Sequence, residues 1–315
     1  MTDAHFQALD PLKTFILKEW DRDVVPPVLV AARDIARRYG DQVAGIVFYG
    51  SCLRTGEIID KVLDFYVIVD SYKEAYGSRA LAAANKILPP NVFYHEIEHD
   101  GVLLRSKYAV LSLEDYHFRV SERCLNVSIW ARFCQPAVLL MARDEKIRDR
   151  LAGDTATAAI TMLKAALPCV QGPVSGQDLW VTAFDLTYSA ELRSEKTGKG
   201  LEIYQLDRPR YDAFLPCILP VMGLGQLENL SLQPSPSDRR RAARRWFFRR
   251  LNGKLVSLLR LIKASFTFDG GIDYLAWKIS RHSGVDIEVT ERMRKYPVIS
   301  GLGLFLILRR KGAFK

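Results

Sequence analysis

The sequence predicts an α+β fold, and three observations lead to this prediction. Short runs of β-branched and aromatic residues fall within residues 1–115, which is typical of strands. Apolar residues recur at helical spacing through residues 116–230. Residues 231–315 begin with a proline- and serine-rich stretch and continue as a basic, apolar segment. We therefore predict a mixed domain, a helical domain and a basic C-terminal region.

The first elements are a helix and two neighbouring strands. The helix should run from Pro26 to Gly40, because prolines open it, glycine closes it and its apolar residues share one face. The strands should cover Ala44 to Gly50 and Val62 to Asp70, joined through the Gly50-Ser51 turn.

Later elements follow the same two periodicities. Residues 78–88 are typical of a helix, and the alternation that starts at Asn91 predicts a third strand. From Ser112 to Pro220 the pattern predicts helices throughout, and the stretch from Ser231 to Arg241 is the best linker candidate.

Composition limits the class of protein. The 315 residues are 49% hydrophobic and 26% charged, as in globular chains, and carry a formal charge of +9 that favours a polyanionic partner. The five cysteines show no zinc-finger or paired spacing, and the first residues do not resemble a signal peptide. No apolar run reaches the roughly 20 residues that span a bilayer. We expect a cytoplasmic protein.

A glycine-serine turn and a following aspartate carry the predicted chemistry. In polymerase-β-like nucleotidyltransferases, backbone amides and a serine hydroxyl of such a turn hold phosphates, and the aspartate binds magnesium. The corresponding residues here are Gly50, Ser51 and Asp64. The usual second carboxylate would stand two residues after the first, where both face the same side of the strand, but Tyr66 occupies that place. An ordinary turn followed by an ordinary strand stays an open alternative.

Four segments in order resemble one enzyme family. FYGSCLR, KVLDFYVIVD, KYAVLSLEDY and LTYSAELRSEKTGK are similar to motifs of the translocator-assembly-and-maintenance type of phosphatidate cytidylyltransferase, the mitochondrial type of CDP-diacylglycerol synthase with bacterial relatives. The resemblance runs with gaps over residues 45–280. It implies a nucleotidyltransferase of phospholipid biosynthesis that uses Mg²⁺.

The resemblance also assigns roles to residues. It implies that Tyr49, Gly50 and Ser51 form the nucleotide turn, with Lys61 near the triphosphate and Asp64 on the metal. Glu191 stands where the family has a helical aspartate and is the implied second metal ligand. The other implied residues are Arg193 in catalysis and Lys196 and Lys199 at phosphates.

Other interpretations of these charged residues stay open. Glu191, Arg193 and Glu195 are also typical of surface ion pairs on a helix. Glu96 and Glu98 share one face of the third strand and compete with Glu191 for the second carboxylate role.

The C-terminal region is basic and amphipathic. Residues 239–250 contain seven arginines, and residues 239–263 predict a helix. Its apolar stripe is Phe247, Leu251, Leu255, Leu258 and Ile262. Its opposite, basic face is Arg241, Arg245, Arg249, Arg260 and Lys263. A cation-flanked apolar run near the C-terminus strengthens the prediction that this region lies on an anionic membrane surface. A core helix with a solvated basic face is the alternative.

Together these features predict transfer of cytidylyl from CTP to phosphatidate at the inner face of the membrane, by a peripheral protein. One alternative is a nucleotidyltransferase with a soluble or RNA acceptor. Few aromatic residues in the arginine run and no recognisable RNA module argue against nucleic acid. The other alternative is a catalytically inactive membrane-surface binding protein.

Overall fold

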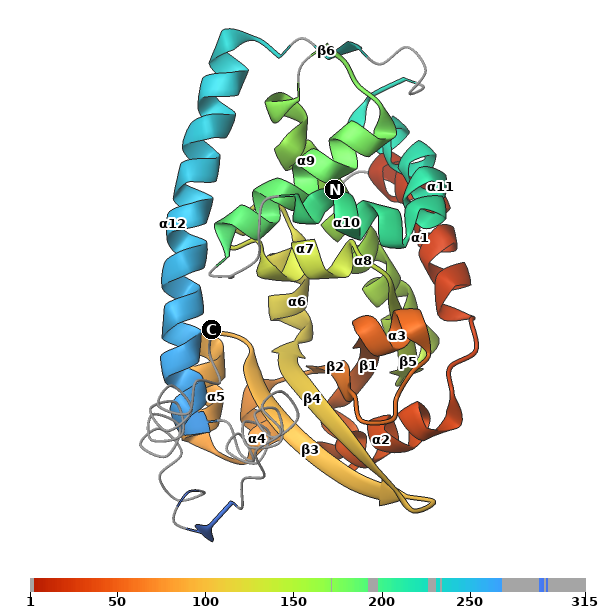
Figure 1. The fold of residues 1–315 in the computed structure, drawn as a ribbon, viewed down its shortest axis with the longest axis vertical. Coiled ribbons are helices and arrows are strands. Elements are labelled where there is room, and N and C mark those ends of the chain that lie inside the picture. The colour runs from red at the N-terminus through yellow and green to blue at the C-terminus, as the bar shows by residue number, and fades with distance from the viewer. Residues whose placement is uncertain are drawn as a thin grey trace, which may run out of the picture.

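The computed structural model describes residues 3–170, 172–191, 198–225, 231–232, 234–267, 289–291 and 293. It is a mixed α+β fold, as predicted, in which helices cover both faces of a five-stranded sheet (Figure 1). The strands are β1 (Val43–Tyr49), β2 (Val62–Val69), β3 (Asn91–His99), β4 (Val102–Ser112) and β5 (Ala137–Ala142).

The order of the strands in the sheet is β3-β4-β2-β1-β5. β1 and β2 pair antiparallel, as do β1 with β5 and β3 with β4. β2 and β4 pair parallel, with Asp64 opposite Lys107. β5 lies within the stretch predicted to be wholly helical, so that prediction is wrong there. Its continuous apolar sequence buries both faces of the strand, a pattern that periodicity does not distinguish from a helix.

The helices can be grouped by their order along the chain. The first group lies along the N-terminal half of the chain: α1 (Asp3–Trp20), α2 (Pro26–Arg37), α3 (Ser51–Thr55), α4 (Tyr72–Tyr76), α5 (Arg79–Ile87), α6 (Leu113–Val120) and α7 (Ser128–Phe133). The second comprises α8 (Glu145–Ala166), α9 (Gly176–Ala190), α10 (Lys199–Leu206), α11 (Arg208–Ile218) and α12 (Pro236–Thr267).

The sheet separates two apolar cores. On one face, Phe48, Phe65 and Val67 pack against α2, whose buried residues Val28 and Ile35 lie on the predicted face. On the other face the core includes residues of α1, α6, α7, α8, α9 and α11 together with α12. This second core draws on all three predicted segments of the chain. The predicted divisions at residues 115 and 230 stay predictions.

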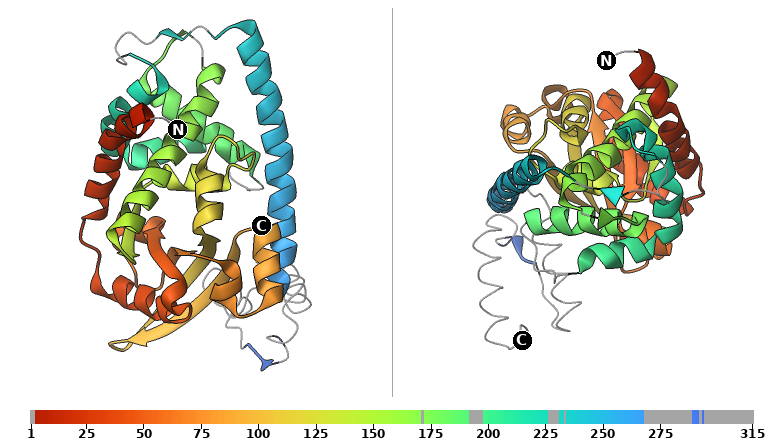
Figure 2. Two further views of the ribbon diagram at one scale, coloured as in Figure 1. Left: turned by 180° about the vertical axis from the view of Figure 1, so that it is seen from behind. Right: turned by 90° about the horizontal axis from the view of Figure 1, so that it is seen from above.

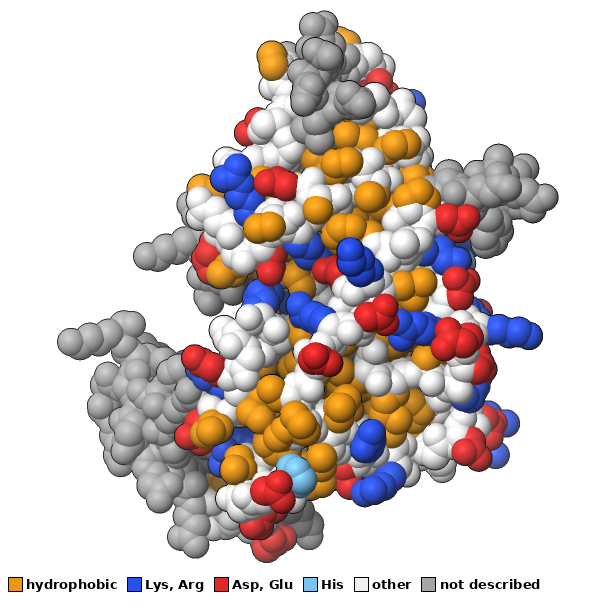
Figure 3. All heavy atoms as spheres, turned by 90° about the vertical axis from the view of Figure 1, so that its right-hand side faces the viewer, with side chains coloured by type: hydrophobic (Ala, Val, Ile, Leu, Met, Phe, Trp, Pro, Cys, Tyr) orange, Lys and Arg blue, Asp and Glu red, His pale blue; other side chains and the backbone are white. Residues whose placement is uncertain are grey.

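Ion pairs also tie the N-terminal helix to the helical layer. Arg210 of α11 contacts Glu19 at 2.5 and 2.8 Å, and Arg148 of α8 contacts Asp21 at 2.6 Å. Basic and acidic side chains are interspersed across the middle of the side that α1 and α11 share (Figure 3). That side therefore presents no large surface of a single charge.

The long helix α12 runs along one side of the molecule and stays on the outside of the helical body in the other views (Figures 1 and 2). It begins at Pro236, inside the predicted linker. A helix over the basic segment was predicted, with its apolar stripe on a membrane and its arginines on lipid phosphates, but part of the predicted basic face lies inside the protein. Arg249 is only 3% exposed, and its guanidinium lies 4.8 Å from the ring of Trp246 and 5.6 Å from that of Trp130.

The predicted apolar stripe of α12 faces outward, as the membrane prediction requires. Phe247 and Leu251 are each 58% exposed, Leu255 54% and Leu258 50%; nothing is described of the Ile262 side chain. Trp246 anchors the inner face, where its indole donates to the Ala165 carbonyl at 3.0 Å. Cation-π stacking lets arginine accompany tryptophan into such a contact. The outward stripe differs from the alternative of a core helix with a solvated basic face, and its contact with a membrane stays a prediction.

Gly253 allows α12 to approach α9 closely. A Cβ atom placed on Gly253 would lie 2.0 Å from the carbonyl oxygen of Ala190, and that oxygen belongs to the backbone. We expect Gly253→Ala to destabilise the fold by about 1–3 kcal/mol in urea unfolding, because α12 must move away from α9. Lys254→Ala, at the neighbouring exposed position, is the control. Equal unfolding midpoints for the two variants would contradict this close packing.

Candidate active site

The turn after β1 brings a glycine against a carboxylate. Tyr49, the last residue of β1, lies opposite Asp64 of β2. Gly50 follows with φ of 93°, a conformation that glycine adopts without steric cost. A Cβ atom on Gly50 would lie 2.9 Å from Oδ2 of Asp64. Ser51 then starts α3 and is exposed. The structure thus brings together the predicted residues Tyr49, Gly50, Ser51 and Asp64.

This contact gives a prediction with an internal control. Gly50→Ala should weaken nucleotide binding about tenfold or more, because the new methyl group displaces the Asp64 carboxylate as well as straining the backbone. Gly56→Ala also puts alanine at positive φ, in the left-handed region at φ of 72° where the strain is smaller, but its Cβ would meet nothing within 4 Å. Titration of both variants with CTP and Mg²⁺ measures the difference. Equal losses would mean that the contact with Asp64 does not matter.

Lys107 of β4 supplies a cation beside Asp64. Its Nζ lies 3.0 Å from Oδ1 of Asp64, across the parallel pairing of β2 and β4. The Oδ1 atom is buried and accepts no hydrogen bond in hydrogen-bonding geometry among the described residues, so the contact with Lys107 is an ion pair. The side chain of Asp64 is 22% exposed. A ligand can therefore reach this carboxylate.

Tyr66 replaces a second carboxylate on β2 with an aromatic ring. It is buried, with its ring centroid 5.1 Å from that of Tyr49 and 5.0 Å from that of Phe133. Burial raises the pKa of its hydroxyl, so Tyr66 stays neutral at physiological pH. This side chain closes one side of the site and supplies no charge for a metal.

Arg132 of α7 adds a second cation above the strand pair. Its guanidinium lies 5.0 Å from the Tyr49 ring centroid. Burial acts to lower the pKa of Arg132, but Tyr49, Tyr66, Tyr188 and Asp64 together raise it above its ordinary value. The guanidinium therefore stays charged, and it is positioned to attract phosphate.

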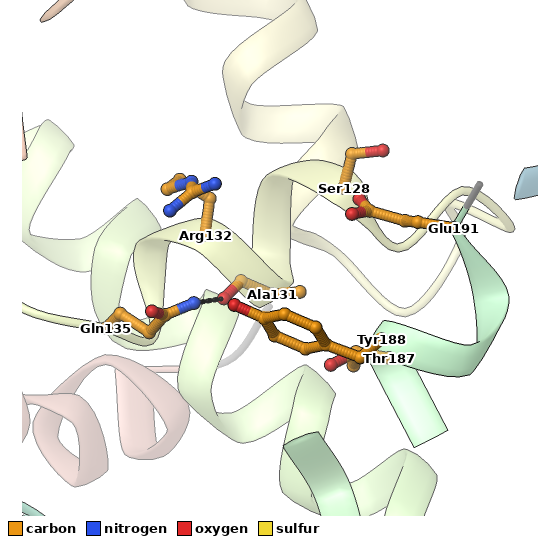
Figure 4. Close-up of a pocket in the computed structure, with 7 residues that line it drawn as sticks. All are labelled: Ser128, Ala131, Arg132, Gln135, Thr187, Tyr188 and Glu191. Carbon is orange, nitrogen blue, oxygen red and sulfur yellow. Dashed lines mark hydrogen bonds between the residues drawn. The ribbon is translucent and has the colours of Figure 1, made fainter. Parts of the chain in front are cut away.

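Glu191 reaches the same region from α9. With Arg132 and Ser128 it lines a small pocket of about 10 Å³, and in the close-up its side chain extends from the end of α9 toward Ser128 of α7 (Figure 4). Glu191 is the residue after the helix, with φ of −99° and ψ of 161°. The predicted helical continuation from Glu191 to Glu195 on one face is therefore wrong at its first residue. The negative charge of Glu191 acts to raise the pKa of both Tyr66 and Arg260.

The remaining predicted residues lie at the edge of this group or outside the described residues. Lys61, just before β2, contacts Glu57 at 3.6 Å. Lys199, the first residue of α10, contacts Glu202 at 2.5 Å. Arg193 and Lys196 lie outside the described residues, and their roles stay predictions.

The competing carboxylates of β3 have partners on the sheet. Glu96 accepts a hydrogen bond of 2.7 Å from the hydroxyl of Tyr94 and lies 3.4 Å from Nε of Arg105. Glu98 lies further along β3, opposite Leu103. Strand β4 lies between β3 and β2 and carries Lys107 and Arg105, so these cations stand between the β3 carboxylates and Asp64. Glu191 is therefore the better candidate for the second carboxylate.

The donor set limits how a metal could bind. In the described part of the chain, no cluster of three or more histidine, cysteine, aspartate or glutamate side chains could hold a metal ion. Mg²⁺, however, commonly takes one or two protein carboxylates and completes its shell with waters and substrate phosphates. The Asp64 carboxylate is 22% exposed, and Lys107 pairs with its buried Oδ1 atom. Its other oxygen would therefore hold a Mg²⁺ ion that arrives with a triphosphate, and Glu191 would be the second ligand.

Two residues of the site were missed in the sequence. Lys107 begins the KYAVLS run that carried part of the resemblance, but its contact with Asp64 depends on the parallel pairing of β2 with β4. Arg132 is one of many arginines in the chain and has no motif around it. A prediction that β2 and β4 are neighbours would have identified Lys107.

Comparison with known proteins finds similarity to solved structures at low identity. No family model matches the chain, and no curated protein matches it. A solved nucleotidyltransferase-like protein from Exiguobacterium sibiricum 255-15 is similar over 90% of this chain and 91% of that one, with 12% identity and a TM-score of 0.27. At this TM-score the likeness establishes no shared chemistry.

Proposed function

We propose that the protein is a phosphatidate cytidylyltransferase, which converts CTP and phosphatidate to CDP-diacylglycerol and pyrophosphate with Mg²⁺. The observation that carries the proposal is the contact of Gly50 with Asp64 at the end of an antiparallel strand pair, beside Lys107 and Arg132. This arrangement provides a close backbone approach for phosphates, a carboxylate for a metal and cations for developing charge. The choice of CTP and phosphatidate follows from the resemblance.

The reaction needs no covalent enzyme intermediate. An oxygen of the phosphatidate phosphate attacks the α-phosphorus of CTP, and the bond from that phosphorus to the bridging oxygen of the β-phosphate breaks as pyrophosphate leaves. In this proposal Lys107 and Arg132 stabilise the negative charge that grows on the phosphates. Asp64 and Glu191 would hold Mg²⁺, which neutralises phosphate charge and orients the attacking oxygen.

The outer face of α12 supports placement at a membrane. The exposed apolar stripe Phe247, Leu251, Leu255 and Leu258 lies among exposed cations of the same helix, including Arg244, Arg245 and Lys254. An apolar face bordered by arginine and lysine is typical of helices that lie in the interface of an anionic bilayer. None of the described helices has both the length and the apolar character to cross a bilayer.

Two observations favour a different candidate. The ion pair of Lys107 with Asp64 and the aromatic ring at Tyr66 would also suit an inactive protein that binds phosphates at a membrane surface. Lys107 would then neutralise the carboxylate permanently instead of acting on a substrate.

Turnover of CTP labelled at the α-phosphate separates these candidates. With Mg²⁺ and vesicles that contain phosphatidate, label should move into the lipid fraction as pyrophosphate is released. Transfer only to a soluble or RNA acceptor would identify the first alternative. Binding of phosphatidate vesicles without any turnover would identify the inactive membrane-binding protein.

A further inference from the structure

Helix α12 contacts both walls of the small pocket in the candidate site. One wall is α7, which carries Ser128 and Arg132, and the other is the end of α9, which carries Tyr188 and Glu191. In the close-up Glu191 extends from the end of α9 toward Ser128 of α7 (Figure 4). A helix that contacts both walls is placed to set the separation between Arg132 and Glu191.

The contact of α12 with α9 is made by a buried glycine. A Cβ atom on Gly253 would lie 2.0 Å from the carbonyl oxygen of Ala190 and 3.8 Å from the amide nitrogen of Glu191. Helix α12 therefore lies against the peptide group that joins Ala190 to Glu191. Ala190 is the last residue of α9, and Glu191 leaves the helix with an extended backbone. The orientation of this peptide group decides where the Glu191 side chain points.

The contact of α12 with α7 is made by hydrogen bonds. The side chain of Asn252, next to Gly253, accepts from the side chain of Asn126 at 3.2 Å. Asn126 is buried and accepts in turn from the backbone amide of Ser128 at 3.2 Å. Further along α12, Arg260 donates to the hydroxyl of Ser128 at 3.0 Å. The start of α7 is therefore held to α12 at two points.

Helix α12 is itself fixed on both sides of Gly253. Before it, the indole of Trp246 donates to the carbonyl of Ala165 at 3.0 Å. After it, Arg260 donates to the carbonyl of Pro89 at 3.0 Å. Because these contacts oppose a shift of the helix, part of any displacement caused by a larger residue at position 253 must fall on the peptide group before Glu191.

We propose that Gly253 and Asn252 are positioning residues, which hold Glu191 where it can bind Mg²⁺ together with Asp64. The inference rests on the proposed function, because it takes Glu191 as a metal ligand. Gly253 acts on the backbone that carries Glu191, and Asn252 acts on the opposite wall of the pocket through α7. Residues that orient a metal ligand without touching the metal typically change metal affinity about 10–100-fold.

Calorimetric titration of the full-length protein with CTP at a series of Mg²⁺ concentrations tests the proposal without any turnover. Gly253→Ala should raise the Mg²⁺ concentration that gives half-maximal CTP affinity about tenfold. The matched control is Gly153→Ala in α8, which adds the same methyl group where the nearest heavy atom, on the Lys13 side chain, lies 3.9 Å away. That variant should require no more Mg²⁺ than the wild-type protein. An equally unchanged requirement in Gly253→Ala would overturn the proposal.

A double-mutant cycle with Glu191→Gln distinguishes positioning from general damage to the fold. If Gly253 acts through Glu191, then Gly253→Ala should not raise the Mg²⁺ requirement further in a protein that already carries Glu191→Gln. A purely structural role would raise the requirement by the same factor in both backgrounds, and that result would refute the inference.

Asn252 provides a milder variant in case Gly253→Ala does not fold. Asn252→Ala removes the acceptor for Asn126 and should raise the Mg²⁺ requirement about threefold, as expected for one hydrogen bond. Asn252→Asp keeps an acceptor oxygen at the same place and should restore the wild-type requirement. Equal losses in the alanine and aspartate variants would show that this hydrogen bond does not position the pocket.

Turnover with short-chain, soluble phosphatidate separates this inference from the proposed function. Gly253→Ala should lose turnover at low Mg²⁺ and regain most of it at saturating Mg²⁺. If Gly253 and Glu191 are coupled in CTP binding but the wild-type protein transfers no cytidylyl group, the positioning role is retained and the proposed function is refuted. If the wild-type protein is active but the two substitutions act independently, the proposed function stands and the positioning role is refuted.

Discussion

Replacing Asp64 by asparagine is expected to abolish the proposed cytidylyl transfer while leaving the fold intact. The amide keeps the shape of the carboxylate that lies against Gly50 but loses the charge that would hold Mg²⁺ and balance Lys107 at 3.0 Å. Removal of one electrostatic contact to a reacting group typically lowers turnover by about 10²–10³-fold, and a metal ligand should cost at least as much. Release of pyrophosphate from CTP in the presence of phosphatidate vesicles measures the effect.

The control for Asp64→Asn is Asp60→Asn, which removes an exposed carboxylate just before the same strand. That variant should retain near wild-type turnover, and both proteins should unfold at similar urea concentrations. Pyrophosphate release by Asp64→Asn at a near wild-type rate would refute the metal assignment.

The second carboxylate is tested by the same assay in Glu191→Gln. A loss comparable to that of Asp64→Asn would support Glu191 as a metal ligand, since it lines the pocket with Arg132 and Ser128. If Glu191→Gln retains turnover and Glu96→Gln loses it, the role belongs to β3 instead.

Local elements of the fold could be predicted because their sequences repeat with the period of the structure they form. The strands at β1, β2 and β3 and the helices α2 and α5 lie where alternation or helical spacing indicated. β5 could not be recognised, because a strand buried on both faces has no alternation. The contact of Asp64 with Lys107 could not be predicted from local sequence patterns either. It joins residues in strands that two helices separate along the chain.

The candidate site also contains residues that local patterns predict and a residue that they do not. Tyr49, Gly50, Ser51 and Asp64 meet because a short connection joins two adjacent antiparallel strands, and sequence patterns predict such pairs. Arg132 arrives from α7, and its position depends on tertiary packing.

The orientation of α12 shows where charge patterning misleads. Sequence reasoning places the arginines on lipid phosphates or in water, but Arg249 packs on Trp246 and Trp130, and Arg260 donates to the backbone around Pro89. These contacts hold the inner cations. The helix is amphipathic and its apolar stripe turns away from the protein, as the membrane prediction requires, but its basic residues divide between the exposed and the inner side.

This outward face leads to the second large expected effect, on membrane binding. Replacing Leu251, Leu255 and Leu258 by glutamine should weaken binding to anionic vesicles about 100-fold. Each leucine side chain is already half exposed, so transfer of its exposed part into the bilayer contributes about 1 kcal/mol, and three together contribute about 3 kcal/mol. The matched control replaces three exposed residues on other helices, Ile87, Leu201 and Leu206, by glutamine.

Salt separates the two contributions to that binding. Each cation near an anionic surface contributes about 1 kcal/mol, which fades as salt rises, whereas burial of apolar groups does not fade. In vesicle flotation the wild-type protein should therefore keep a salt-resistant fraction that the leucine variant lacks, while both lose binding as salt increases. If the variant floats as well as the wild-type protein at high salt, or if the wild-type protein never binds anionic vesicles, then the stripe does not contact lipid. The exposed face of α12 would in that case have to pack against protein, because an apolar stripe of this length is rarely left in contact with water.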